Sequence, residues 1–126
     1  MSQQILIENQ THPLVKPIVA AYYNQFFNRL RVLMFQAGVE PRRGIVLVQD
    51  RESKIDSAIH MFFCNFELGV VWINNQYQVV DTCLAKRWRP FYEPARPARF
   101  VLETHPDHLQ EFHIGDQLTF KKVAVG

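Results

Sequence analysis

Short apolar runs, separated by polar or turn-forming residues, divide most of this chain into β-strands. Four of these runs lie outside the middle of the chain, at Leu14–Ala20, Ile45–Val48, Arg99–Glu103 and Gln117–Ala124. In the last run Leu118 and Phe120 alternate with polar residues, as in a strand with one buried face. Pro17 cannot donate a backbone hydrogen bond, so we expect the first strand to be irregular or at a sheet edge.

The middle of the chain predicts a central strand, a bend and a hairpin. Both alternating sets of Ala58–Cys64 are mostly apolar, which is typical of a strand buried on both faces. Glu67–Gly69 should form a bend or bulge before a second strand at Val70–Ile73. Asn74–Gln76 then predicts a tight turn into a strand at Tyr77–Leu84, because asparagine tolerates positive φ.

Two segments have features of helices. One apolar set, at intervals of four, three and four residues, consists of Tyr23, Phe27, Leu30 and Met34. This spacing predicts an amphipathic helix over residues 24–35, with Asn24 as its N-cap. Pro106 suits the first turn of a short helix that ends near Phe112. The expected fold is therefore β-rich α+β, a mostly antiparallel β-barrel or two-layer sheet with one helix packed on it and a second short helix.

Composition is consistent with one globular domain over residues 1–126, in which residues 1–12 form an irregular N-terminal segment. The chain is 48% hydrophobic and 21% charged, so disorder is not expected. No apolar run is long enough for a transmembrane helix, and the N-terminus has no secretory signal pattern. We therefore expect no membrane association, a cytoplasmic location, and two free thiols at Cys64 and Cys83 rather than a disulfide.

Several segments, in order along the chain, resemble one known family. They are Arg29–Phe35, Gly44–Val48, Ile59–Phe63, Val70–Ile73, Phe100–Glu103 and Ile114–Leu118. Together they are similar to the family called domain of unknown function 192, from about residue 20 onward. Val32, Cys64-Asn65 and Glu67–Gly69 depart from the family pattern, so the chain resembles a divergent member. The family has no settled biochemistry, and the resemblance implies a fold more than a function.

Histidines are the candidates for catalysis or metal binding. His60 lies on an apolar segment, where it is either an acid–base or ligand group or a core histidine bonded to backbone. His105 and His108 could bind a metal if the helix start brought them to one side, but a solvated helix N-terminus explains them equally. Asp116 after Gly115 is typical of a turn. A hydrolase or metal-dependent enzyme using these histidines stays an alternative, and we assign no catalytic residue, metal ligand or cofactor.

The loop between residues 85 and 99 is the strongest local departure from the average composition. It carries five basic residues and one acidic residue, while the whole chain has a net charge of +2. Guanidinium groups bind phosphate or carboxylate, and aromatic faces stack on rings. The simpler alternative is a solvated loop whose aromatic residues cover one end of the barrel. The candidate ligand-binding residues are Arg87, Trp88, Arg89, Tyr92, Arg96, Arg99, His60 and Glu67.

These features favour a non-catalytic binding or accessory domain. The site would lie between the Lys86–Arg99 loop and the Phe62–Gly69 bend, and its ligand would be a small anion, a carbohydrate or an acidic partner surface. A single basic loop is a small footprint for nucleic acid, so weak single-stranded nucleic-acid binding is a further alternative. The partner is thus an unidentified small ligand or protein, and the sequence leaves the oligomeric state open.

Overall fold

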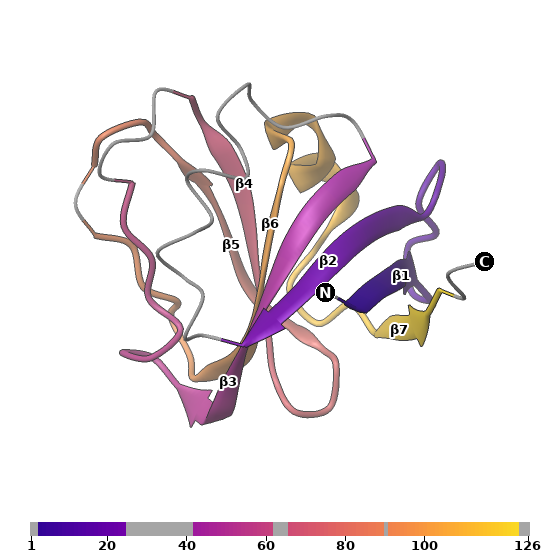
Figure 1. The fold of residues 1–126 in the computed structure, drawn as a ribbon, viewed down its shortest axis with the longest axis horizontal. Coiled ribbons are helices and arrows are strands. Elements are labelled where there is room, and N and C mark those ends of the chain that lie inside the picture. Colours follow the sequence, from indigo (N-terminus) through magenta and orange to yellow (C-terminus); the bar gives the residue numbers. More distant parts are fainter. Residues whose placement is uncertain (1–2, 25–41, 62–65, 90, 124–126) are drawn as a thin grey trace.

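The structure is a computed structural model that describes residues 3–24, 42–61, 66–89 and 91–123. Its core is a single seven-stranded sheet in the order β5-β4-β6-β3-β2-β1-β7 (Figure 1). The strands are β1 (Gln3–Asn9), β2 (Ile18–Asn24), β3 (Arg43–Ser53), β4 (Leu68–Ile73), β5 (Val79–Ala85), β6 (Ala98–Thr104) and β7 (Leu118–Lys122). β2 and β3 are parallel, and the other paired strands are antiparallel.

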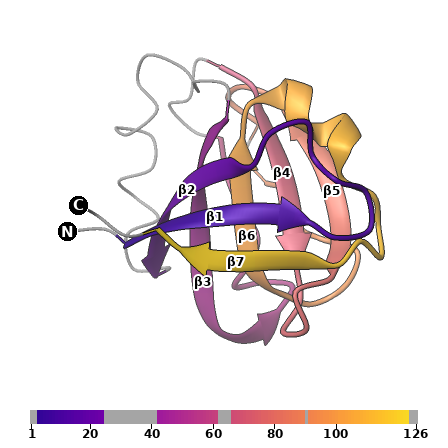
Figure 2. The ribbon, with the colours of Figure 1, turned by 90° about the vertical axis from the view of Figure 1, so that its right-hand side faces the viewer.

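The two edge strands of this sheet meet at one end. Gln78, just before β5, forms an isolated antiparallel bridge with Gln117, just before β7. Next to this bridge the Leu118 amide donates to the Tyr77 carbonyl oxygen at 2.8 Å. The sheet is therefore curled into a half-barrel, with β1 and β7 lying across from β4 and β5 (Figure 2).

Apolar side chains pack on both faces of the curled sheet. The inner cluster joins residues from opposite sides of the half-barrel, among them Ile7, Ile73, Leu102 and Leu118. The outer cluster contains Leu47, Trp72 and Val101, with Ile59 and Met61 packed over them. Adjacent residues of β6 alternate between the clusters, because successive side chains of a strand point to opposite faces. The central strands therefore separate two buried cores.

One short helix, η2 (Pro106–Glu111), lies among the described residues and is of the 3₁₀ type. His105 is its N-cap and Pro106 opens it, as the sequence predicts. The amphipathic helix expected over residues 24–35 falls on residues outside the described part, except that Asn24 ends β2. The β-rich α+β prediction is confirmed, with a single short helix in the described segments. No helix in these segments is long and apolar enough to cross a membrane.

The predicted central strand at Ala58–Cys64 is wrong for its described part. Ile59 forms only an isolated bridge, with Tyr92, and residues 62–65 are outside the described ranges. Ile59 and Met61 are buried because they cover the outer face of the sheet. An apolar run can therefore arise from a segment that packs on a sheet face, and here the middle of the sheet is formed by β6, β3 and β2.

Three local expectations also need correction. The N-terminal segment is regular over most of its described part, because Gln3–Asn9 forms β1 between β2 and β7. The second strand begins at Ile18, directly after Pro17, so the proline caps the start of an interior strand. Leu68 and Gly69 belong to β4 rather than to a bend. In contrast, the hairpin around Asn74–Gln76 is confirmed as the connection between β4 and β5.

Candidate functional site

The backbone of the basic loop is held against residues 59–61. The Trp88 amide donates to the Met61 carbonyl oxygen, and the Met61 amide donates to the Arg89 carbonyl oxygen, both at 3.0 Å. Ile59 and Tyr92 exchange two backbone hydrogen bonds of 2.9 Å. These bonds fix the path of the loop where it leaves β5, although the loop has no regular strand of its own.

The first part of the loop, directly after β5, exposes basic and aromatic side chains to solvent. Lys86, Arg87 and Arg89 are exposed, and Trp88 is 49% exposed with a positive φ of 64°. Phe91 is 56% exposed. We call residues 86–89 with Phe91 the loop tip. A hydrogen-bonded backbone that presents arginine, lysine and aromatic groups is suited to contact an anionic partner.

Tyr92 has a structural part in the loop tip. Its hydroxyl oxygen accepts the Lys86 amide hydrogen at 2.7 Å, and its ring packs with the outer core. The Arg89 guanidinium carbon lies 5.9 Å from the centroid of the Tyr92 ring, within reach of a cation–π contact. Tyr92 thus braces the start of the loop and positions one of its arginines.

The structure does not bring Arg99 to the loop tip. Arg99 lies at the start of β6, where its Nε donates to the Gln49 carbonyl oxygen at 3.1 Å. Its Nη1 is 3.4 Å from Asn75 Oδ1, at the tip of the β4–β5 hairpin. The later part of the loop lies beside the first half of β5, since the Ala95 amide donates to Asp81 Oδ2 at 2.8 Å. Arg96 is exposed on this distant part of the loop.

His60 and Glu67 are the remaining predicted site residues. His60 is partly buried between Ile59 and Met61, whose backbone atoms bond to the loop. Glu67 is exposed immediately before β4. In the described segments His60 is not part of a convergent group of metal-ligating side chains.

His108 is engaged through both of its ring nitrogens. Nε2 accepts the Arg42 amide hydrogen at 3.1 Å, so Nδ1 carries the proton that is donated to Glu111 Oε2 at 2.9 Å. The nearby His105 accepts the Asp107 amide hydrogen at Nδ1 and caps η2. These two histidines therefore organise the helix, and in the described ranges they do not belong to a convergent group of three or more metal-ligating side chains.

A hollow of about 320 Å³ adjoins these residues and is lined in part by Arg42, His105 and Glu111. Burial raises the pKa of Glu111, but hydrogen bonds from His108 and Arg42 outweigh it and hold the pKa below its ordinary value. The Arg42 Nη1 lies 3.2 Å from Glu111 Oε2. This arginine is already paired, which makes the hollow a weak candidate for anion binding.

A histidine–carboxylate cluster that the sequence patterns do not predict lies where β1 ends. His12 Nδ1 is 2.7 Å from Asp116 Oδ1, and His113 Nδ1 is 3.5 Å from Asp116 Oδ2. Asp116 is 1% exposed, whereas the side chains of His12 and His113 are about half exposed. Burial raises the pKa of Asp116, but hydrogen bonds from Asn9, the His113 amide and His12 outweigh this effect and hold the pKa below its ordinary value.

Asn9 holds this cluster together. Its Oδ1 accepts the amide hydrogens of Thr11 and His12, both at 3.0 Å, which shapes the β1–β2 connection. Its Nδ2 donates to Asp116 Oδ2 at 2.7 Å. His12 and Asp116 are far apart in sequence, so no local spacing marks them as neighbours. The Gly115-Asp116 turn was the only available signal, and it fits a plain turn equally well.

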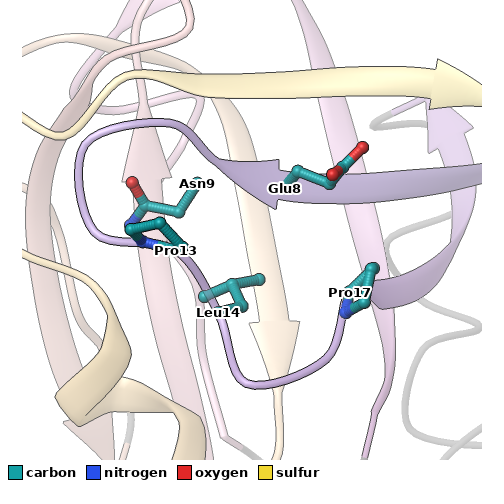
Figure 3. Close-up of a pocket in the computed structure, with 5 residues that line it drawn as sticks. All are labelled: Glu8, Asn9, Pro13, Leu14 and Pro17. Carbon is teal, nitrogen blue, oxygen red and sulfur yellow. The ribbon is translucent and has the colours of Figure 1, made fainter.

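The β1–β2 connection also borders a small hollow (Figure 3). Its volume is about 70 Å³, and Glu8, Asn9, Pro13, Leu14 and Pro17 line it. Ligand pockets usually have volumes of about 300 Å³ or more. This hollow is therefore too small for an organic ligand.

The cysteine in the described part of the chain is not poised for chemistry. Burial raises the pKa of the Cys83 thiol to about 12, and the charges of Asp81 and Glu103 raise it too. A thiol that stays protonated at neutral pH is a poor nucleophile and a poor metal ligand. Cys83 is a free thiol, and Cys64 lies outside the described residues.

Comparison with known proteins decides the family. The sequence profile of the DUF192 family, described as an uncharacterized ACR, matches residues 7–120. This chain belongs to the DUF192 family. The segments through which the sequence resembles DUF192 include Phe100–Glu103 in β6 and Ile114–Leu118 at the start of β7. They therefore form the sheet and the turn that carries Asp116.

Relatives of this DUF192 chain are named UPF0127 proteins. That of Pyrococcus furiosus is 29% identical over 108 residues, covering 84% of this chain and 90% of the relative. That of Thermococcus gammatolerans is 36% identical over 78 residues, covering 62% of this chain. The second match spans 49% of the relative, about half of its length.

Two crystal structures share the fold of this DUF192 chain. One is a protein from Sinorhizobium meliloti 1021 that is named a putative transcription regulator. Its TM-score is 0.78 at 13% sequence identity, and the match covers 95% of this chain and 94% of that one. The other is a protein of unknown function from Novosphingobium aromaticivorans, with a TM-score of 0.72, 13% identity and coverage of 92% and 83%. At this identity the likeness concerns the fold alone.

Proposed function

We propose that this DUF192 chain is a non-catalytic binding domain that recognises an acidic partner surface through its loop tip. The observation that supports this most is the loop geometry: a backbone pinned to residues 59–61 with exposed Lys86, Arg87, Trp88 and Arg89. Arginine and tryptophan are enriched among the residues that dominate protein interfaces. Their guanidinium and indole groups combine attraction to carboxylates with apolar contact area.

An acidic surface suits this site better than a small anion or a carbohydrate. Small ligands usually bind in concave sites that bury most of their surface. The loop tip is instead exposed, as expected for contact with another macromolecule.

Tryptophan fluorescence offers a direct test. The chain has two tryptophans: Trp72 is 1% exposed and bonded to the Ser57 carbonyl oxygen, while Trp88 is 49% exposed. Titration with poly-L-glutamate, as a carboxylate-bearing probe, should change the Trp88 signal, and the apparent affinity should fall with added salt. The double variant Arg87→Ala/Arg89→Ala should bind at least about tenfold more weakly, as expected for charge-assisted contacts.

The matched control is Lys54→Ala/Arg96→Ala, which makes the same change in net charge at exposed positions away from the loop tip. It should retain most of the affinity. Equal losses in both double variants would mean that net charge alone attracts the probe, and would contradict the proposal. Binding of a single-stranded oligonucleotide, with no binding of poly-L-glutamate, would replace it with nucleic-acid recognition.

A further inference from the structure

We propose that His12, His113 and Asp116 form a binding site for a zinc-class divalent metal ion. In the described part of the chain this is the one group of three metal-ligating side chains whose donor atoms converge, all within 4.8 Å of one another. The site is independent of the loop tip, because its residues come from the β1–β2 connection and from the turn before β7.

The donor set selects the kind of ion. Two imidazole nitrogens and one carboxylate oxygen suit zinc and neighbouring first-row transition metals. Magnesium and calcium prefer shells made of oxygen atoms. Three protein ligands with a fourth position left to solvent or a small ligand is also a common arrangement for zinc. We therefore expect Zn²⁺ or Co²⁺ to bind and Mg²⁺ not to compete.

The spacing of the donor atoms is close to what such an ion requires. Zinc bonds of about 2.0–2.1 Å in a tetrahedral site place neighbouring ligand atoms roughly 3.3 Å apart. His113 Nδ1 lies 3.5 Å from Asp116 Oδ2, and the two imidazole ring centroids are 4.4 Å apart. His12 Nδ1 is closer to Asp116 Oδ1, at 2.7 Å, because the two share a hydrogen bond. A bound ion would replace that proton and separate the two atoms slightly.

The carboxylate is held in place by groups that are not ligands themselves. Asn9 Nδ2 and the His113 amide donate to Asp116 Oδ2 at 2.7 and 2.9 Å. Asn9 Nδ2 also lies 3.2 Å from the Glu111 carbonyl oxygen. These bonds leave Oδ1 directed at the imidazole of His12. Such outer contacts orient metal ligands and raise affinity, because the site is organised before the ion arrives.

The histidines keep the freedom and access that binding needs. Their side chains are 53% and 56% exposed, for His12 and His113 respectively, so an ion can enter from solvent and the rings can adjust. The third ligand, Asp116, is buried and fixed. Metal binding would therefore join the β1–β2 connection to the turn before β7 and stabilise the folded state.

The test uses the untagged full chain after removal of metal with EDTA. Isothermal titration with ZnCl₂ should show one ion per chain, and Co²⁺ should give the visible absorption of a tetrahedral site. His12→Ala and His113→Ala should each weaken Zn²⁺ binding at least about tenfold, since each removes one of three ligands. Asp116→Asn should weaken it too, while its side-chain oxygen still accepts the turn hydrogen bonds. Zn²⁺ should raise the melting temperature of the wild-type chain by more than that of these three variants.

His105→Asn is the matched control. It removes another histidine next to an aspartate, and asparagine keeps the capping role at η2. This variant should bind Zn²⁺ as the wild type does, and circular dichroism should show all variants folded. Absence of Zn²⁺ binding at micromolar concentrations, or binding that His12→Ala and His113→Ala leave unchanged, would overturn the site. Failure here would leave the loop-tip proposal untouched, because poly-L-glutamate binding can be measured in EDTA.

Discussion

At the scale of single residues, Gly44 shows how closely β3 and β6 approach. A Cβ atom at this position would lie 2.8 Å from the Glu103 carbonyl oxygen and 3.2 Å from Leu102 Cδ1. The nearer atom belongs to the backbone of an inner strand, which cannot move without disturbing the sheet. Gly69 in β4 is tight as well, but there the nearest atom is the side-chain Cγ of Leu109, at 3.0 Å. The glycine that opens the apolar strand is thus required by packing.

We predict that Gly44→Ala destabilises the protein by about 1–3 kcal/mol, as expected for overpacking at a close backbone contact. Gly69→Ala should cost less, because the nearest backbone atom there, the His105 carbonyl oxygen, would lie 3.1 Å from the added Cβ rather than 2.8 Å. The free energies of unfolding from urea titrations, monitored by circular dichroism, would compare the two. A Gly44→Ala protein as stable as the wild type would contradict the close approach of β3 and β6.

At the scale of elements, η2 is tied to the start of β3 by a small polar network. Arg42, with a positive φ of 66°, precedes β3, and its amide donates to His108 on the helix. Glu111 at the end of η2 accepts from His108 and lies 3.2 Å from the Arg42 guanidinium. The helix also packs on β4 at Gly69, where Leu109 fills the space next to the glycine. The network and this contact together attach η2 to one end of the half-barrel.

This network should make stability depend on pH. The pKa of Glu111 is lower in the folded state than its ordinary value. The ionised Glu111 carboxylate therefore stabilises the folded state in full above the unfolded pKa of about 4.3. The contribution is lost as the pH falls through the lower, folded pKa. We predict that Glu111→Gln reduces the free energy of unfolding near pH 7 and has a shallower loss of stability below about pH 4.3.

Urea titrations at several pH values, in the presence of a chelator, would measure this difference. Asp116 also has a lowered pKa and remains in both proteins, so it does not contribute to the comparison. If the wild type and Glu111→Gln lost stability in parallel as the pH fell, the network around Glu111 would not be responsible.

At the scale of the whole molecule, the curled sheet separates two hydrophobic cores, one on each of its faces. Leu102 of β6 is fully buried in the inner cluster, and Leu47 of β3 is 1% exposed in the outer cluster. The outer cluster is covered by residues 59–61 and by the loop whose tip is the proposed binding surface. The loop therefore has a packing role beneath its exposed basic side chains, which explains why its backbone is held in one path.

Matched leucine substitutions would test whether both faces are true cores. We predict that Leu47→Ala and Leu102→Ala each lower the free energy of unfolding by about 2–5 kcal/mol, the range for buried leucines. Leu84→Ala is the control, because Leu84 is 39% exposed, and it should change stability by no more than about 0.5 kcal/mol. A Leu47→Ala protein as stable as the control would show that the outer face is not closely packed.

The amino-acid sequence by itself determined the elements whose signal is local. The asparagine turn, the apolar strands at β3 and β6, and the proline at the start of η2 all follow from patterns a few residues long. Such patterns act through backbone conformation and side-chain alternation, which need no distant partner. The resemblance to DUF192 was visible for the same reason, because it rests on short segments in a fixed order.

The tertiary structure alone decided which segments meet. The apolar run at Ala58–Cys64 has the pattern of a central strand, but Ile59 and Met61 lie over the sheet instead of within it. Likewise, no local pattern predicts that His12 would lie 2.7 Å from Asp116 at the other end of the chain. Alternation specifies that a residue is buried, but the partner that buries it is chosen by the packing of the whole curled sheet.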